Sequence, residues 1–193
     1  MFRPDYPIRT DRLILRPFTL DDLDDLFAIY SRPDVARYLY WEPRGRIEVA
    51  ESLDRKLAQS VLAEQGQRLT VAVVLPALER VIGDVTLKWL SSEHRQGEIG
   101  FSFHPDHHGF GFATEAAEAM LELGFQGLRL HRIIGRCDAR NMRSARVLER
   151  LGMHREAYFV HNEMVKGEWG DELVYAVCED DWRARTKEAR FQR

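Results

Sequence analysis

The sequence predicts a single α/β domain in which helices pack on a central mixed sheet whose first half is antiparallel. Three observations predict this fold class. Apolar runs of strand length follow one another in the middle of the chain and are joined by short polar turns, as in hairpins. Helical periodicity alternates with strand patterns in the second half. A length of 193 residues suits one domain.

The N-terminal region begins with a strand and two helices. Residues 12–18 alternate at period two, which predicts a strand. Thr19 is a candidate N-cap, followed by acidic residues, and apolar residues recur at helical spacing as far as Tyr30. A second helix is expected from about residue 47 to 64. The domain core is expected to cover about residues 8–182, with a charged tail over 183–193.

The middle of the chain predicts two successive hairpins. Three β-rich runs cover residues 68–75, 80–89 and 97–104, with short polar connections between them. Residues 112–125 then carry apolar side chains at helical spacing, so a helix leaves the third strand.

The last third returns to alternating elements. A strand is expected over residues 131–139 and a helix over 142–151, which Gly152 ends as a C-cap. Residues 153–165 and 168–178 then flank a turn and predict a final hairpin.

Composition excludes several classes of protein. The net charge of −3 is too small to favour nucleic acid or an anionic membrane as a partner. No stretch approaches the roughly 20 apolar residues that span a bilayer, and the first residues lack the apolar core of a signal peptide. Cys137 and Cys178 lie far apart in apolar runs and are expected to be reduced. We therefore expect a cytoplasmic protein.

The most informative segment connects a strand to a helix. Its two glycines allow a tight turn and close approach to a ligand, and the helix start offers free N–H groups that suit a pyrophosphate. A tight connection that binds nothing is the alternative. The segment reads His108-Gly109-Phe110-Gly111-Phe112-Ala113-Thr114.

A dinucleotide-binding turn fits this segment less well. The Rossmann pattern requires a third glycine where Thr114 stands, and it requires a parallel βαβ unit. Asp138 at the end of the following strand is the one feature that keeps that alternative open. No Gly-Lys-Ser/Thr follows the glycines, which excludes a nucleotide triphosphatase loop.

Four segments carry a family resemblance. Residues 105–116 resemble the pyrophosphate-binding motif of the GNAT superfamily of acetyl-CoA-dependent N-acetyltransferases, and residues 141–153 resemble its second motif. The segments 12–18 and 166–175 are similar to the Rim-type branch, which includes ribosomal-protein N-terminal acetyltransferases. Asp106 departs from the family, which usually has Gln or Arg there.

The resemblance implies a sheet that splays between the strand ending near His104 and the strand beginning near His131. Acetyl-CoA would lie in the splay as acyl donor, and a primary amine would accept the acetyl group. Unpaired strand groups at a splay can pair with the pantetheine amides. The implied donor contacts are His108, Gly109, Phe110, Gly111, Phe112, Ala113, Thr114, Asn141 and Ser144.

The resemblance also implies catalytic roles. Glu98 begins the strand that leads into the glycine turn, where family members place a carboxylate that activates the amine; the alternative is a solvated strand residue. Ser144 or Tyr158 would assist departure of the thiolate. Capping explains Asn141 equally well, a backbone hydrogen bond would explain Ser144, and packing would explain Tyr158.

The acceptor pocket is expected to include Tyr38, Trp41, Asp84 and Trp89. An α-amino group, with a pKa of about 7.7–8.0, is partly neutral near pH 7.5, which favours a peptide or protein N-terminus over lysine. Two other classes remain open: a non-catalytic CoA-binding module and an NAD(P)-dependent oxidoreductase. The sequence also leaves open a homodimer.

Two further groups of residues, histidines and arginines, carry metal-binding or charged side chains. Three histidines share one loop but lack a further ligand at helical spacing, so no metal is expected; they are His104, His107 and His108. Arginines are dense in the second half, where some could meet the 3′-phosphate of CoA and most would be solvated. These are Arg129, Arg132, Arg136, Arg140, Arg143, Arg146 and Arg150.

Overall fold

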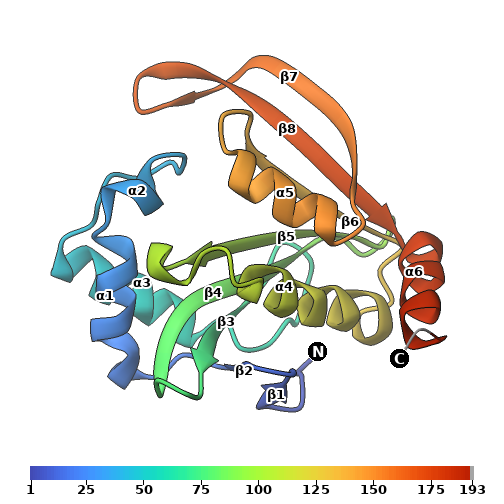
Figure 1. Ribbon diagram of the computed structural model, residues 1–193, viewed down its shortest axis with the longest axis horizontal. Coiled ribbons are helices and arrows are strands. Elements are labelled where there is room, and N and C mark those ends of the chain that lie inside the picture. The colour runs from blue at the N-terminus through green and yellow to red at the C-terminus, as the bar shows by residue number, and fades with distance from the viewer. Residues whose placement is uncertain (192–193) are drawn as a thin grey trace.

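The computed structural model describes residues 1–191 and shows helices on both faces of one eight-stranded sheet (Figure 1). The strands are β1 Ile8–Arg9, β2 Ile14–Arg16, β3 Arg68–Leu75, β4 Arg80–Ser91, β5 Gln96–Phe103, β6 Arg132–Asp138, β7 His154–Val165 and β8 Glu168–Cys178. The α-helices are α1 Leu23–Tyr30, α2 Pro33–Ala36, α3 Arg46–Leu57, α4 Phe112–Glu122, α5 Met142–Arg150 and α6 Glu179–Phe191. Short helical turns cover η1 Leu20–Asp22, η2 Pro105–His107 and η3 Leu123–Gly127.

The strand order is β1-β2-β3-β4-β5-β6-β8-β7. The pairs from β1 to β5 are antiparallel, β5 and β6 are parallel, and β6, β8 and β7 are again antiparallel. The predicted fold class, a mixed sheet with an antiparallel first half, is therefore confirmed.

Three expectations about elements differ from the structure. The helix expected to reach residue 64 ends at Leu57, because the next residues bond elsewhere: Gln59 O accepts from the Thr70 N–H at 2.8 Å and Leu62 pairs with Phe2. The four-residue helix α2 was not expected. Helix α6 begins before the expected tail and runs into it, and Trp182 stacks on Phe125 with ring centres 5.1 Å apart.

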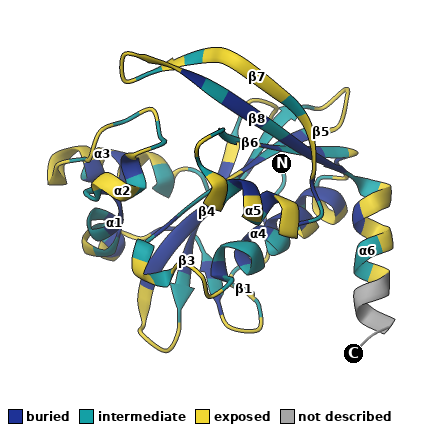
Figure 2. Ribbon diagram, turned by 45° about the horizontal axis from the view of Figure 1, so that its top comes forward, coloured by how far each residue is buried: buried dark blue, intermediate teal, exposed yellow. Residues whose placement is uncertain are grey.

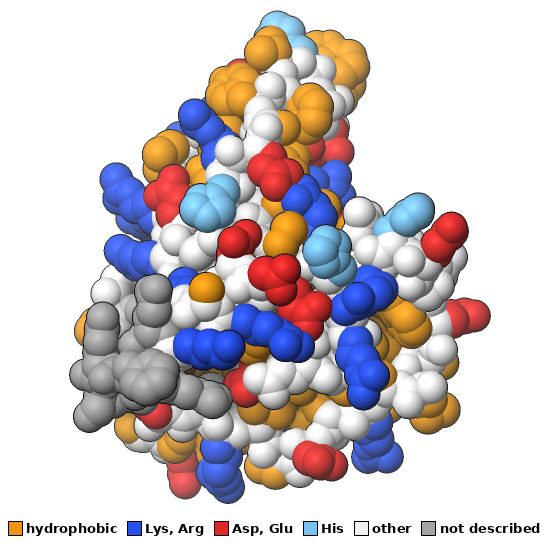
Figure 3. Space-filling model, turned by 90° about the vertical axis from the view of Figure 1, so that its right-hand side faces the viewer, with side chains coloured by type: hydrophobic (Ala, Val, Ile, Leu, Met, Phe, Trp, Pro, Cys, Tyr) orange, Lys and Arg blue, Asp and Glu red, His pale blue; other side chains and the backbone are white. Residues whose placement is uncertain are grey.

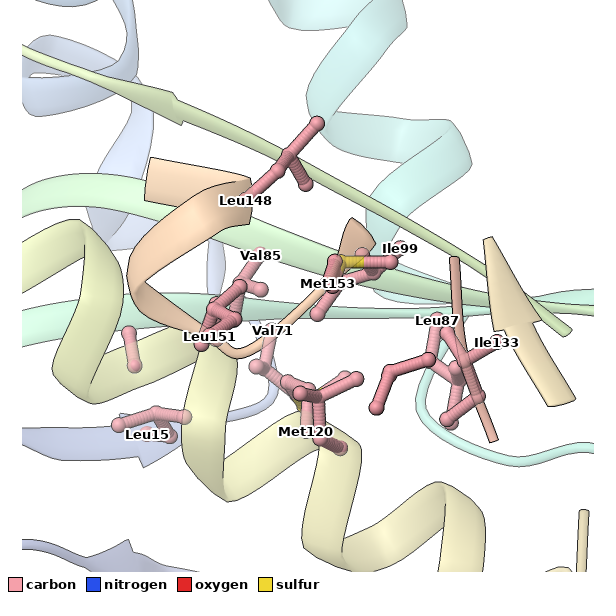
Figure 4. Close-up of a cluster of buried hydrophobic side chains, with 14 of the residues drawn as sticks. Leu15, Val71, Val85, Leu87, Ile99, Met120, Ile133, Leu148, Leu151 and Met153 are labelled. Atoms are coloured by element: carbon pink, nitrogen blue, oxygen red, sulfur yellow. The ribbon is translucent and has the colours of Figure 1, made fainter. Parts of the chain in front are cut away.

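Alternation along β3 divides the hydrophobic core between the two faces of the sheet. Val71 and Val73 belong to the main core with residues of α4 and α5, whereas Ala72 between them belongs to a second core with α1 and α3. Figure 4 shows part of the main core, with side chains from α4, α5 and the strands, among them Met120, Leu148 and Val85. Helices α4 and α5 therefore cover one face of the sheet, and α1 and α3 cover the other.

The sheet splays between its two central strands, as expected. Strands β5 and β6 pair only where Gln96–Ile99 lie beside Arg132–Gly135. Among the described residues, Gly100–Phe103 have no strand partner on the β6 side, and apart from the Phe103 carbonyl, which lies 3.1 Å from Nε2 of His108, their backbone groups on that side are free to bind a ligand. The hairpin β7–β8 arches beyond the splay, and β7 is largely exposed (Figures 1 and 2). In the part of the chain that is described, no helix is both long and apolar enough to cross a membrane.

Candidate active site

Two cavities meet at the splay. The larger, of about 900 Å³, lies between the glycine turn and α5, and we name it the donor cavity. The smaller, of about 530 Å³, lies among β4, β5, β6 and β8, and we name it the acceptor cavity. Residues from three separate parts of the chain line both cavities: Tyr38, Leu39, Phe101, Ser102, Asn141 and Ser144. A group bound in one cavity can therefore meet a group bound in the other at this junction.

The glycine turn forms one wall of the donor cavity. Gly109 and Gly111 have φ angles of +85° and +83°, a region that favours glycine, and Gly111 precedes the first residue of α4. The hydroxyl of Thr114 is buried without a hydrogen-bond partner among the described residues. Free N–H groups at the helix start and this hydroxyl form a donor-rich site, which fits a pyrophosphate.

Most of the residues predicted to contact the donor line this cavity. The exception is Phe110, whose side chain is 60% exposed and stacks on Phe112 with ring centres 5.8 Å apart. The lining residues from the predicted set are His108, Gly109, Gly111, Phe112, Ala113, Thr114, Asn141 and Ser144.

One histidine and several arginines complete the donor cavity. His108 bridges two of its walls, because Nε2 lies 3.1 Å from the Phe103 carbonyl oxygen and Nδ1 lies 3.2 Å from Nη1 of Arg143. Four of the arginines noted in the sequence line the cavity: Arg140, Arg143, Arg146 and Arg150. Their charge suits a ligand that carries several phosphates.

The start of α5 lies at the junction of the two cavities. Asn141 caps the helix, as its position predicted, by accepting a hydrogen bond from the Ser144 N–H at 3.1 Å. This cap uses the backbone of Ser144 and leaves its hydroxyl outside the capping interaction. Because Ser144 lines both cavities, its hydroxyl is placed to interact with a group that passes between them.

The acceptor cavity is built on a polar face of the sheet. Asp84, Thr86 and Lys88 alternate with the core residues Val85 and Leu87 along β4. Neighbouring strands continue the polar row, because Asp84 lies opposite Ser102 and Lys88 lies opposite Glu98. At the acceptor cavity, these strands therefore present main-core residues to one side and a row of hydrogen-bonding groups to the other.

Glu98 shares one guanidinium with a second carboxylate. Nε and Nη2 of Arg136 donate to the Glu98 oxygens at 3.2 and 3.3 Å, and Nη1 lies 3.6 Å from Oε1 of Glu172. Burial raises the pKa of Glu172 above its ordinary value, against the opposing effect of Arg136. Two carboxylates with one cation leave this cluster net negative when both are ionised.

Asp84 is the other buried carboxylate of the acceptor cavity. It accepts a hydrogen bond from the Tyr30 hydroxyl at 2.8 Å, and Nζ of Lys56 lies 3.2 Å from Oδ1. Burial and the neighbouring Asp84 charge raise the pKa of Tyr30 well above its ordinary value, so the phenol stays a hydrogen-bond donor. Asp84 therefore forms part of the wall with its charge already paired.

The other predicted pocket residues lie in different places. Tyr38 lines both cavities. Trp41 packs on Tyr30 with ring centres 4.9 Å apart, and Trp89 packs against the main core and donates Nε1–H to the Ser91 carbonyl at 3.2 Å. Neither tryptophan is among the described residues that line the cavities.

Tyr158 lies on the exposed strand β7. Its side chain is 51% exposed and its hydroxyl donates to the Asp171 carboxylate. Asp171 lines the acceptor cavity, but Tyr158 is not among the described lining residues of either cavity. The structure thus brings Glu98 and Ser144 to the two cavities and leaves Tyr158 outside the described lining of both.

The hairpin β7–β8 contacts the end of α2 and the segment that follows it across the acceptor cavity. Nζ of Lys166 donates to the Ala36 carbonyl at 2.8 Å and lies 3.4 Å from Glu42. The Tyr40 hydroxyl donates to the Glu163 carboxylate, and both of these residues line the cavity. Two segments more than 120 positions apart in sequence therefore meet over the acceptor cavity.

Sequence reasoning missed much of the acceptor cavity, including Lys56, Arg136, Glu163 and Glu172. One signal was available: a polar residue at every second position of a central strand, as in residues 84–88, indicates a strand with one polar face. The contacts across the cavity had no such signal, because they join side chains from distant parts of the chain.

Comparison with known proteins places the chain in a family. Residues 12–154 match the family model described as an acetyltransferase (GNAT) domain. An uncharacterized N-acetyltransferase of Bacillus subtilis is 32% identical over 175 residues, which cover 91% of this chain and 98% of that protein. The spermidine N(1)-acetyltransferase of Escherichia coli is 24% identical over 90% of this chain and 89% of its own length.

A solved structure agrees with these matches. The crystal structure of a GNAT-family acetyltransferase from Bacillus anthracis has a TM-score of 0.80 and 30% identity, and the match covers 93% of this chain and 99% of that one. The splayed sheet, the glycine turn and the two joined cavities thus occur on a fold shared with known acetyltransferases. The chain belongs to the GNAT acetyltransferase family and transfers an acetyl group from acetyl-CoA to an amine.

Proposed function

We propose that acetyl-CoA occupies the donor cavity and that a primary amine on a small cationic molecule occupies the acceptor cavity. The observation that carries this proposal is the junction of the two cavities at Ser144, with phosphate-binding chemistry on one side and carboxylates on the other. Acetyl-CoA supplies an activated acyl thioester. The chain must hold it, bring a neutral amine to it and stabilise the charges that develop.

The donor side binds through its backbone and its arginines. The N–H groups at the start of α4 and the Thr114 hydroxyl hold the pyrophosphate, and the free backbone groups of Gly100–Ser102 on the β6 side pair with the pantetheine amides. Backbone N–H groups in the same splay stabilise the oxyanion as the amine attacks. Ser144 then donates a hydrogen bond to the departing thiolate. We favour Ser144 over Tyr158 for this role because only Ser144 lines the cavities.

The acceptor side removes the proton of the amine. Glu98 lines the acceptor cavity and is not among the described lining residues of the donor cavity. Its carboxylate therefore meets the acceptor before the acceptor reaches the donor. It accepts the proton directly or through a water molecule. Asp84 is a weaker candidate for this role because its side chain is only 6% exposed, against 21% for Glu98, and it is held by both Lys56 and Tyr30.

Two features support a cationic acceptor. Six carboxylates line the acceptor cavity against four basic side chains; the carboxylates are Asp84, Glu98, Asp138, Glu163, Asp171 and Glu172. The spermidine acetyltransferase among the relatives acts, by its name, on a polyamine. A peptide or protein N-terminus, which the Rim-type resemblance suggested, is the second candidate, since an α-amine is partly neutral at pH 7.5.

A screen of acceptors tests the proposal. Acetyl-CoA would be mixed with spermidine, with short peptides bearing a free N-terminus and with the same peptides blocked by an N-acetyl group, and the release of free thiol would be measured. We expect thiol release with spermidine and Glu98-dependent turnover. Turnover of free peptides but not of polyamines would transfer the proposal to N-termini. Tight CoA binding without turnover of any amine would instead favour a CoA-binding module.

Assembly and location complete the proposal. Strand β7 ends the sheet and carries exposed apolar side chains, which Figure 3 shows in orange at the top of the molecule. An edge strand of this kind supports a homodimer. We also propose that the protein works in the reducing cytoplasm, where its two free cysteines would stay reduced.

A further inference from the structure

The glycine turn is held from outside the donor cavity by Arg12, which lies just before β2. Nη1 of Arg12 donates to the Phe110 carbonyl at 2.9 Å, and the guanidinium carbon lies 4.7 Å from the centre of the Phe112 ring. Arg12 is not one of the described residues that line the donor cavity. It therefore contacts the outer side of a turn whose inner side faces the cavity.

Glu115 fixes the orientation of this guanidinium. Nε of Arg12 donates to Oε2 at 2.7 Å, while the Arg12 N–H and the Thr10 hydroxyl donate to Oε1 at 2.8 and 2.6 Å. Burial raises the pKa of Glu115, but these hydrogen bonds outweigh it and hold the pKa below its ordinary value. The carboxylate stays charged, and it holds Arg12 in a fixed position against the turn.

The bond to the Phe110 carbonyl determines how the next peptide group lies. In a planar trans peptide, the Phe110 carbonyl and the Gly111 N–H point in opposite directions. Glycines at positions 109 and 111 flank this region, and glycine permits several backbone conformations there. With its carbonyl held toward Arg12, this peptide directs the Gly111 N–H to the other side of the turn, and Gly111 lines the donor cavity.

Arg12 also offsets an unfavourable charge. Glu115 lies in the first turn of α4, beside the helix start that would hold a pyrophosphate. An unpaired carboxylate there would repel the phosphates, whereas the ion pair with Arg12 neutralises it.

We propose that Arg12 is a positioning residue for CoA: it orients the Phe110–Gly111 peptide and neutralises Glu115, so that the turn can accept the pyrophosphate. This inference rests on the proposed placement of the pyrophosphate on that turn. Arg12 would act through the turn and would not touch the ligand. Its removal should therefore weaken only ligands that carry the pyrophosphate.

The test compares two ligands on the wild type and on Arg12→Gln. CoA affinity would be measured by calorimetry, and the affinity of pantetheine, which lacks the pyrophosphate, by NMR titration. We expect Arg12→Gln to weaken CoA by about 10- to 100-fold, the size of a lost hydrogen bond to a charged group, and to leave pantetheine unchanged. Arg12→Lys should weaken CoA in the same direction, because lysine cannot hold Glu115 and the Phe110 carbonyl with a rigid fork.

Arg9→Gln is the matched control, since it removes the same charge from exposed strand β1 and should leave both affinities unchanged. Unchanged CoA affinity in a folded Arg12→Gln protein would overturn the inference, as would an equal loss for pantetheine. If the pyrophosphate did not bind at the glycine turn at all, the Gly111→Val variant would bind CoA as tightly as the wild type, and this result distinguishes failure of the proposed function from failure of the inference about Arg12.

Discussion

The donor cavity and the acceptor cavity are built in different ways. The critical wall of the donor cavity is a continuous segment, residues 108–114, in which backbone conformation at two glycines and the start of α4 provide the binding groups. The acceptor cavity is assembled from side chains on the six strands β3 to β8 and on helices and the segment around Tyr40. A binding site made of backbone groups tolerates sequence change outside its glycines, whereas a site made of side chains changes with each substitution.

This difference suggests how the family varies its acceptors. In the proposed function the donor is acetyl-CoA, and backbone groups of the glycine turn bind its pyrophosphate. By their names, two relatives act on different acceptors, spermidine and an alanine of ribosomal protein uS5, and the acceptor cavity here is lined by single side chains such as Glu98, Arg136 and Glu172. Substitutions on the donor side should therefore change CoA affinity, and those on the acceptor side should change the rate or acceptor recognition.

The largest effect is expected at Gly111. Its φ of +83° is strained for any side chain, and an added Cβ would lie 3.4 Å from Nη2 of Arg12, so valine would disturb both the backbone of the turn and the contact that holds it. Gly111→Val should abolish measurable CoA binding in calorimetry while circular dichroism shows a folded protein. Gly45→Ala is the control, because Gly45 has a φ of −71° and its added Cβ would meet only the Glu48 carboxylate at 3.6 Å. Normal CoA affinity in folded Gly111→Val would contradict the placement of the pyrophosphate on the glycine turn.

The second effect is on the rate. Glu98→Gln should lower kcat by about 10²–10⁴-fold, the usual loss of a general base, and leave the Kd for acetyl-CoA unchanged. Activity should recover partly at high pH, because an alkaline medium deprotonates the amine without help. Glu93→Gln, on the exposed turn between β4 and β5, should be neutral. A near-normal kcat for Glu98→Gln near neutral pH would contradict the general-base role and leave Glu98 as a lining residue of the cavity.

The third effect is on stability. Lys56→Met would leave the buried Asp84 carboxylate without its cation and should lower the free energy of unfolding by about 3–5 kcal/mol. Urea titration measures this loss. The exposed pair of Arg46 and Asp24 gives the control, since Arg46→Met should cost about 1 kcal/mol or less. CoA affinity should not change in either variant. Weaker CoA binding in Lys56→Met would show that the two sides are not independent.

The smallest effects separate the two candidates for thiolate departure. Ser144→Ala should lower kcat by about 10- to 100-fold, the size of a hydrogen bond to a charged group, with CoA affinity retained. Tyr158→Phe should leave kcat unchanged, because the Tyr158 hydroxyl contacts Asp171 on the exposed hairpin. Steady-state kinetics on both variants decides the matter. A loss only in Tyr158→Phe would reverse the two roles.

The donor side could be predicted from the sequence because its parts are contiguous. Two glycines between a strand and a helix determine a turn, and Asn141 before a helical pattern determines a cap; both lie where the sequence indicated. The fold class could be predicted for the same reason, since hairpins and strand-helix units depend on neighbouring residues. Phe110 is the exception, because its direction depends on packing against Phe112.

The acceptor side could be predicted only in part. Glu98, Tyr38 and Asp84 do line the cavity, but Trp41 and Trp89 pack in the core region, since a large aromatic ring is buried wherever the fold has space. The pairing of Arg136 with Glu98 needs the β5–β6 register, and the contact of Tyr40 with Glu163 needs the path of the final hairpin. Long-range geometry of this kind is absent from local sequence patterns.

A crystal structure of the chain with CoA would test the division into two cavities most directly. We predict that the pyrophosphate lies on the turn at residues 109–114 and that the CoA sulfur lies in van der Waals contact, about 4 Å, with the Ser144 side chain. The acceptor cavity, with Glu98 and Arg136, should remain free of CoA. A pyrophosphate bound away from the turn, or a sulfur far from Ser144, would contradict the account.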